Sequence, residues 1–186
     1  MKCLTKAEIA AWMKLAGFAV GHEDKPIVES VLPKYHKHLM IDVPNEALRL
    51  HYFSARLVQW LPNGSPRILF LTDWHTYPPA PLTTFETLRL GCGEARHIID
   101  APGHLFEAFE GGNDDFYKDK PSALLTGIVS LALGYDWYGY LASQTPMEYI
   151  VLGDGFISFS TASDEKFDEA KEIAKTFELR QRGQSS

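Results

Sequence analysis

The sequence predicts an α+β fold in which helices pack against a single antiparallel or mixed sheet. One observation is the apolar run at residues 67–72, which is typical of a buried strand. A second is the series of three segments after Tyr135 that are rich in aromatic and β-branched residues. Apolar residues at helical spacing near both ends of the chain are the third. Consecutive strands favour antiparallel pairing, so we expect a C-terminal three-strand meander followed by a helix.

Two helices are predicted before the first strand. Thr5 and Glu8 form a capping box, and apolar residues then recur at helical spacing until Gly17. Asn45 can cap the second helix, which Pro62 ends, although a strand at this place is the main competitor. The apolar face of this second helix consists of Leu50, Phe53, Leu57 and Trp60. Between the helices we expect a loop with one extended piece, residues 39–43.

The strand at residues 67–72 is followed by a short predicted helix. This helix begins at Thr83 or Thr84, and Gly91 and Gly93 mark its end. A second strand is expected at residues 97–99.

Two further helices are predicted before the meander. Pro102 can lie in the first turn of a short helix that carries Leu105 and Phe106. A longer helix begins at Pro121 or Ser122 and is apolar on all sides, which indicates a central position in the fold.

The meander is predicted from residue 136 onward. In its first strand alternate side chains point to opposite faces, so we expect Trp137 and Leu141 in the core and Tyr138 and Tyr140 toward solvent. The turn of residues 153–155 leads into the last strand.

A final helix begins at Ser163 with an apolar stripe at helical spacing. The chain shows no internal repeat and no break in composition that would mark a second domain. We therefore expect one α+β domain, residues 1–180, and a disordered tail, residues 181–186.

Composition indicates a folded protein and excludes several classes of function. Of the 186 residues, 45% are hydrophobic and 23% charged, far from the balance of disordered chains. The formal net charge is −6 without a basic stripe, which argues against a nucleic-acid partner. No apolar run is long enough for a membrane span, and the start of the chain lacks a signal-peptide pattern. Cys3 and Cys92 do not form a disulfide framework, so we expect a cytoplasmic location.

The candidate catalytic residues are Asp73, His75, His97 and His104. Asp73 and His75 follow the buried strand directly, where a rigid element fixes the direction of the first loop residues. Acid–base catalysis needs such groups in one pocket with suitable pKa values, and hydrogen bonding within an aromatic loop is the structural alternative.

We expect neither a metal nor another cofactor. His104 with Glu107, and His36 with His38, have spacings that can place two ligands on one face, but each pair lacks a third ligand nearby. No phosphate-binding loop or nucleophile elbow is present, and Cys92 lies outside any known catalytic pattern.

Aromatic residues provide the candidate binding surface: Trp74, Tyr77, Tyr138 and Tyr140. Tryptophan and tyrosine combine a large apolar area with a polar tip, which suits contact with another protein. A homodimer stays open as well, because an exposed edge strand could pair with a second copy.

Several segments between Ala55 and Ser160 together resemble a group of small uncharacterised bacterial proteins. They are ARLVQWLP, ILFLTDWH, DAPGHLFE, DWYGYL and GDGFISF. In that group a strand ends in Thr, an acid and Trp, and an APGHLF segment and an aromatic, Asp and Tyr-Leu strand follow. This chain differs in HTYPP and in the order of Asp and Trp in DWYGYL. The resemblance implies one folded bacterial domain and carries no activity.

These observations favour a non-catalytic protein-binding domain, with an immunity-like or inhibitor-like role as one form of it. The alternative is a small hydrolase that uses the Asp and His residues between positions 73 and 104.

Overall fold

The computed structural model describes most of the chain: residues 1–18, 36–62, 64–72, 79–91, 93, 96–106, 120–144 and 148–182. For residues 79–82 and 120–122 it describes the backbone only.

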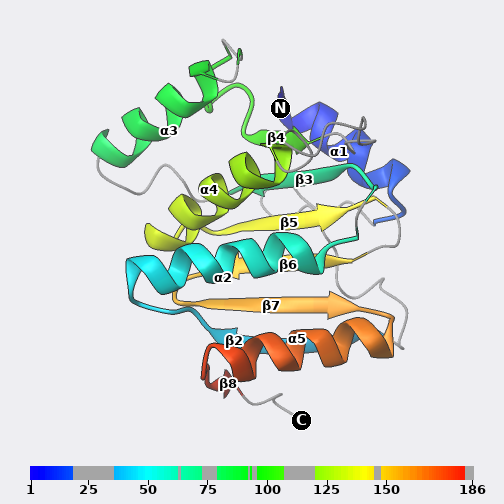
Figure 1. Ribbon diagram of the computed structural model, residues 1–186. Coiled ribbons are helices and arrows are strands. Elements are labelled where there is room, and N and C mark those ends of the chain that lie inside the picture. The colour runs from blue at the N-terminus through cyan, green and yellow to red at the C-terminus, as the bar shows by residue number, and fades with distance from the viewer. Residues whose placement is uncertain are drawn as a thin grey trace.

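One antiparallel sheet of eight strands runs through these residues, in the order β1-β4-β3-β5-β6-β7-β2-β8 (Figure 1). The strands are β1 (Lys2–Leu4), β2 (Lys37–Asp42), β3 (Arg67–Leu71), β4 (Gly103–Phe106), β5 (Gly139–Ser143), β6 (Tyr149–Gly153), β7 (Phe156–Thr161) and β8 (Gln181–Arg182). This confirms the predicted α+β class and its C-terminal meander, β5-β6-β7.

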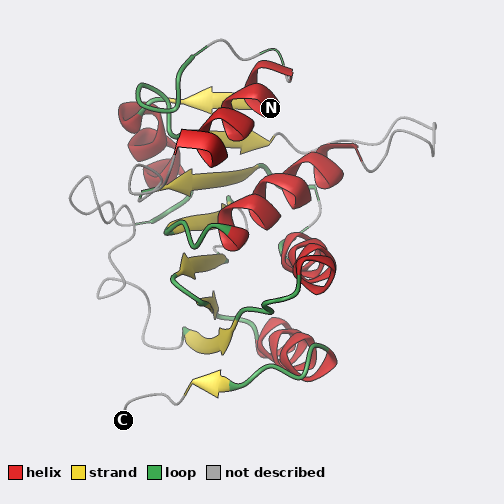
Figure 2. Ribbon diagram, turned by 90° about the vertical axis from the view of Figure 1, so that its left-hand side faces the viewer, coloured by secondary structure: helices red, strands yellow, loops and turns green. Residues whose placement is uncertain are grey.

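In the part of the chain that the structure describes, five helices accompany the sheet: α1 (Lys6–Leu15), α2 (Ala47–Trp60), α3 (Pro79–Gly91), α4 (Lys120–Gly134) and α5 (Asp164–Thr176). The helices α2, α4 and α5 cover one face, and α1 lies on the other (Figure 2). Among the described residues, no helix has the length and apolarity that crossing a membrane requires.

Strand register divides the core into two layers. On the face of α2, α4 and α5, Leu69 pairs with Leu141, Leu141 with Ile150, and Ile150 with Phe159. The neighbouring residues Ile68, Ala142 and Tyr149 point to the face of α1. All residues of β3, β5 and β6 are buried, as expected for central strands covered on both faces.

The predicted capping residues begin α1 and α5, whereas α2 begins differently. In α1, Glu8 N–H donates to Thr5 Oγ1 at 3.3 Å and Thr5 N–H donates to Glu8 Oε2 at 2.7 Å, which is the predicted capping box. Ser163 caps α5 by accepting from Lys166 N–H at 3.2 Å. The cap residue of α2 is Glu46 rather than Asn45, and its side chain makes no capping bond.

Sequence reasoning was wrong on both sides of Pro102. Residues 98–100 form a turn, not a strand, and the segment from Gly103 to Phe106 is strand β4 rather than a helix. Partners remote in sequence decide this, because β4 lies between β1 and β3 and bonds to both.

Three other elements also differ from the prediction. The helix α3 begins at Pro79, before the expected threonines. Gln181 and Arg182 form β8 against β2, so the predicted tail joins the sheet at its first two residues. Finally, α4 contacts α2 but is not enclosed, since Leu124 and Leu131 are only half-buried and Tyr135, just beyond its end, is exposed.

The connection from α4 to β5 needs an unusual backbone. Asp136 has a φ of 54°, and Trp137 N–H donates to Ala132 O at 2.8 Å. This left-handed residue ends the helix as a glycine commonly does. It turns the chain so that Trp137 becomes fully buried, as predicted.

Candidate functional site

The structure describes some of the predicted site residues and not others. Asp73, Trp74, His75 and Tyr77 lie outside the described residues. His97 and His104, in contrast, are described and have very different surroundings.

His104 belongs to the core. Its side chain is fully buried on β4, with Nδ1 3.3 Å from Leu69 O, and its ring meets Phe85 edge to face at 5.1 Å. A substrate would have to open the contact between α3 and the sheet to reach this imidazole. The position therefore suits packing better than catalysis.

His97 lies at the surface, with 57% of its side chain exposed, and Glu86 holds it there. Its Nδ1 is 3.2 Å from Glu86 Oε1, which also accepts from Ile98 N–H at 2.7 Å. The fully buried guanidinium of Arg89 lies 3.8 Å from Glu86 Oε2 and donates to Ala101 O at 2.7 Å. One carboxylate thus has an imidazole, a backbone N–H and a guanidinium around it, and it leaves Nε2 of His97 directed away from the contact.

The predicted binding tyrosines Tyr138, just before β5, and Tyr140, within it, do not form an exposed pair. Tyr140 is only 4% exposed and belongs to the core beneath α1, so the expectation that it faces solvent was wrong. Tyr138 is half-buried and meets Tyr140 edge to face at 5.9 Å. The face opposite the large helices is covered at this strand, and alternation alone could not show that.

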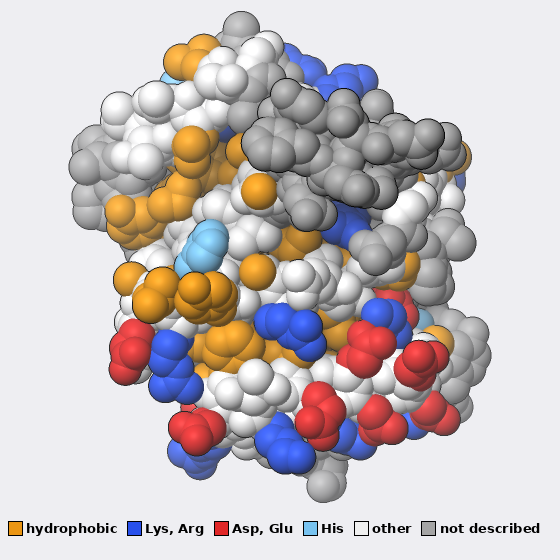
Figure 3. Space-filling model, in the orientation of Figure 1, with side chains coloured by type: hydrophobic (Ala, Val, Ile, Leu, Met, Phe, Trp, Pro, Cys, Tyr) orange, Lys and Arg blue, Asp and Glu red, His pale blue; other side chains and the backbone are white. Residues whose placement is uncertain are grey.

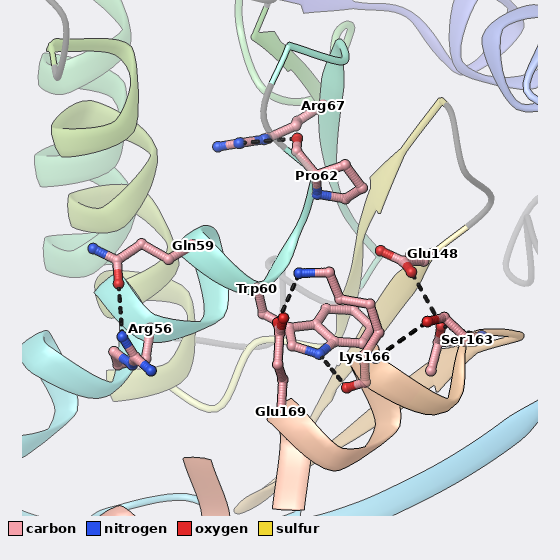
Figure 4. A network of polar contacts seen from close by, with 10 residues as sticks. Arg56, Gln59, Trp60, Pro62, Arg67, Glu148, Ser163, Lys166 and Glu169 are labelled. Carbon is pink, nitrogen blue, oxygen red and sulfur yellow. Dashed lines mark hydrogen bonds and ion pairs between the residues drawn. The ribbon is translucent and has the colours of Figure 1, made fainter. Parts of the chain in front are cut away.

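Sequence reasoning missed a buried polar row at one end of the sheet, of which Figure 4 shows Arg67 and Glu148. Arg67 pairs with Ser143, whose N–H and Oγ both donate to Glu148 O, and Thr161 pairs with Lys37. Arg67, Glu148 and Thr161 are buried. A charged residue directly before the apolar run YIVL was the signal, because alternation places Glu148 on the same face as Ile150.

Glu148 is the most unusual residue of this row. Only 2% of it is exposed, Oε1 accepts from Thr161 Oγ1 at 3.1 Å, and Oε2 has no hydrogen-bond partner among the described residues. Burial raises the pKa of the Glu148 carboxyl above its ordinary value, although the Thr161 hydrogen bond and the charge of Lys166 partly oppose this.

The helix α5 contacts the row at its N-cap, where Ser163 N–H donates to Thr161 Oγ1, and Lys166 lies in its first turn. Trp60 Nε1 donates to Lys166 O at 2.8 Å and so joins the end of α2 to α5. The Lys166 ammonium pairs with Glu169 at 2.7 Å, as Figure 4 shows, rather than with Glu148.

The outer surface of α2 and α4 is apolar at one end (Figure 3). Leu48 is 68% exposed, Tyr52, one turn later, is 60% exposed, and Tyr135 just beyond α4 is exposed as well. A Cβ atom on Gly134 would lie 3.4 Å from Leu50 Cδ2, so the start of α2 and the end of α4 are neighbours. We call Leu48, Tyr52 and Tyr135 the α2/α4 face.

A metal site finds little support in the part of the chain that the structure describes. It contains no group of three or more His, Cys, Asp or Glu side chains that could hold a metal ion. His36 and His38 lie on one face of the sheet with ring centroids 6.5 Å apart, and Nδ1 of His36 is 3.0 Å from Ser160 Oγ. Burial, and next the charge of His38, lower the pKa of His36.

Comparisons with protein-family models, with curated proteins and with solved structures find nothing that matches this chain.

Proposed function

We propose that this chain is a non-catalytic protein-binding domain and that the α2/α4 face is its contact surface. The observation that carries the proposal is the exposure of a leucine and two tyrosines on adjoining helix ends. Single exposed apolar residues are ordinary, whereas a cluster of them is typical of an interaction site. The predicted protein partner is thus retained, with a different surface from the one that the sequence suggested.

The chemistry of the face suits a protein partner. Tyrosine supplies a large contact area with few rotatable bonds, so its ordering on binding costs little entropy. Leu48 and Tyr52 lie four residues apart on α2 and present one continuous apolar strip. Such anchors contribute most of the binding energy when a partner covers them fully.

Charge defines the partner further. Glu46 precedes α2 and Asp136 follows Tyr135, both exposed, so an acidic residue lies at each helix end beside the face, while α2 itself carries the basic residues Arg49 and Arg56. The whole chain carries a formal charge of −6. A protein that offers an apolar pocket with basic residues at its rim is complementary to this face, and its encounter would be accelerated by charge. Immunity or inhibition by occlusion is a role of this kind, because it needs no catalytic group.

Site-specific photocrosslinking tests the proposal. A benzophenone amino acid is placed at position 52 in the native host, and the same probe at position 15 serves as the control, since Leu15 is 78% exposed on α1. We expect one basic protein crosslinked from position 52 and not from position 15. Leu48→Asp should abolish that crosslink, whereas Leu15→Asp should leave it unchanged.

Two results would contradict this assignment. If positions 52 and 15 crosslink the same proteins, the α2/α4 face is not a selective contact surface. A crosslink from position 52 only to a second copy, with a dimer in light scattering, would replace the basic partner with self-association.

One specific observation favours the hydrolase alternative: Glu86 Oε1 lies 3.2 Å from His97 Nδ1 and so orients the imidazole. A carboxylate that binds Nδ1–H fixes the tautomer in which Nε2 can accept a proton, as the orienting acid does in catalytic triads. The buried His104 lies outside this arrangement.

Hydrolysis of a panel of ester, amide and phosphate substrates tests the alternative. Activity that His97→Gln and Glu86→Gln both reduce at least 100-fold, while His51→Gln does not, would favour the enzyme. Activity unaffected by His97→Gln would remove its support.

A further inference from the structure

We propose that Glu148 is a proton-binding group, which holds a proton in the folded protein and opposes folding when it loses that proton. The row of buried polar side chains at the end of the sheet carries this inference independently of the proposed binding function.

The hydrogen bonds around Glu148 suit a neutral acid. A buried carboxylate is stable when several donors or a cation surround it. Glu148 receives one side-chain hydrogen bond, from Thr161 at 3.1 Å, and Oε2 has no partner in the described part of the chain. Burial of the neutral form costs far less than burial of a charge with a single donor.

The Thr161 hydroxyl connects Glu148 to the start of α5. Ser163 N–H donates to Thr161 Oγ1 at 3.0 Å, so the hydroxyl is both an acceptor from the helix cap and the donor to Glu148. Ser163 Oγ in turn accepts from Lys166 N–H, which caps the helix. A change in the charge of Glu148 therefore affects the hydrogen bond between Thr161 Oγ1 and Ser163 N–H, at the residue that caps α5.

Among the described residues, no charged group on the surrounding elements pairs with Glu148 Oε2. On α5, Lys166 pairs with Glu169, and that negative charge works against ionisation of Glu148. On β2, Lys37 pairs with Asp164. Arg67 on β3 is separated from Glu148 by β5 and donates to Pro62 O at 3.1 Å. Ser143 and Thr161 are the neutral neighbours on β5 and β7.

The sign of the pH effect follows from the raised pKa of Glu148. Below the pKa of the unfolded chain, both states hold the proton and the group costs nothing. As the pH rises from there to the pKa of the folded protein, unfolding releases a proton and stability falls. Over that window one proton changes the unfolding constant by about tenfold for each pH unit.

Urea unfolding of the full chain between pH 4 and pH 8 tests the inference with Glu148→Gln, a neutral residue of the same shape. We expect the ratio of unfolding constants, wild type to variant, to rise with pH by up to about tenfold per unit and then to level off. The control Glu172→Gln removes another exposed acid of α5, one that pairs with Lys175 instead of Lys166, and should not reproduce this rise. A ratio that is constant above pH 4.5, or that falls, would overturn the proposal.

If Glu148→Gln does not fold, infrared spectroscopy of the wild type tests whether Glu148 is protonated in the folded protein. The C=O stretch of a protonated acid that persists above the ordinary glutamate pKa and disappears on unfolding supports the inference. Complete ionisation with a normal glutamate titration contradicts it.

Discussion

Two largely buried glutamates, Glu86 and Glu148, have opposite surroundings in this molecule. Glu86 lies on α3 and is contacted by Ile98 N–H, His97 and the guanidinium of Arg89. Glu148 lies just before β6 and receives one hydroxyl hydrogen bond, from Thr161. Burial alone therefore does not determine the charge of a carboxyl, because the number and charge of its donors decide which form is stable.

The largest effect is expected from Arg89→Met, which removes the buried cation of the Glu86 group. Arg96 O and Ala101 O would lose their donor, and Glu86 would keep a largely buried charge without a cation beside it. We expect a loss of about 3–5 kcal/mol in the free energy of unfolding, measured with urea. Arg56→Met at an exposed position should change it by about 0.5 kcal/mol or less. A comparably small loss in Arg89→Met would mean that the guanidinium is not needed.

Glu86→Gln compares the two acids directly. The amide removes the negative charge from a site with two hydrogen-bonding groups, Ile98 N–H and His97, and the nearby Arg89 guanidinium, so we expect a loss of about 1.5–3 kcal/mol at pH 7. Glu148→Gln, measured under the same conditions, should leave stability unchanged or increased. Equal losses in both variants would show that the two carboxyls are in the same charge state.

Thr161→Val isolates the single donor of Glu148. The substitution keeps the shape of the side chain but leaves Ser163 N–H and Glu148 Oε1 without their partner. A loss of about 1–3 kcal/mol is expected from urea unfolding. Thr176→Val is the matched control, since that hydroxyl is exposed on α5, and it should have little effect. If the two variants behave alike, the hydroxyl of Thr161 does not support the row.

Ser163→Ala should give the smallest effect, about 1 kcal/mol, because it removes the cap of α5 but leaves the buried row intact. Hydrogen exchange should accelerate in the first turn of α5 and not in α1, whose cap is Thr5. Ser163→Asp keeps an acceptor at the helix N-terminus and should restore protection. Equal acceleration in α1 would indicate global destabilisation instead.

Much of the fold was predictable because its signals are local. The capping residues Thr5 and Ser163, the apolar run of β3 and the alternation in β5 need only neighbours in sequence to be recognised. Strand β4 was predicted as a helix because its assignment depends on β1 and β3, which are far away along the chain.

The candidate site was less predictable than the fold. A histidine in this part of the chain can be exposed, as His97 before the turn is, or fully buried, as His104 on β4 is, and no local pattern separates the two cases. The same holds for Tyr140, whose outward position on the strand meets α1 and its core instead of solvent. Leu48 and Tyr52 were missed because only the packing of α2 beside α4 shows that they have no cover.

Local sequence patterns specify the α+β class, the meander, the positions of most helices and the acidic charge, since periodicity, capping and composition are properties of neighbouring residues. Tertiary structure alone decided which strands complete the sheet, which histidine reaches solvent, where apolar residues remain exposed, and how few donors surround Glu148. Each of those depends on distances between residues remote in sequence and on the water that packing removes, and neither quantity can be read along a chain.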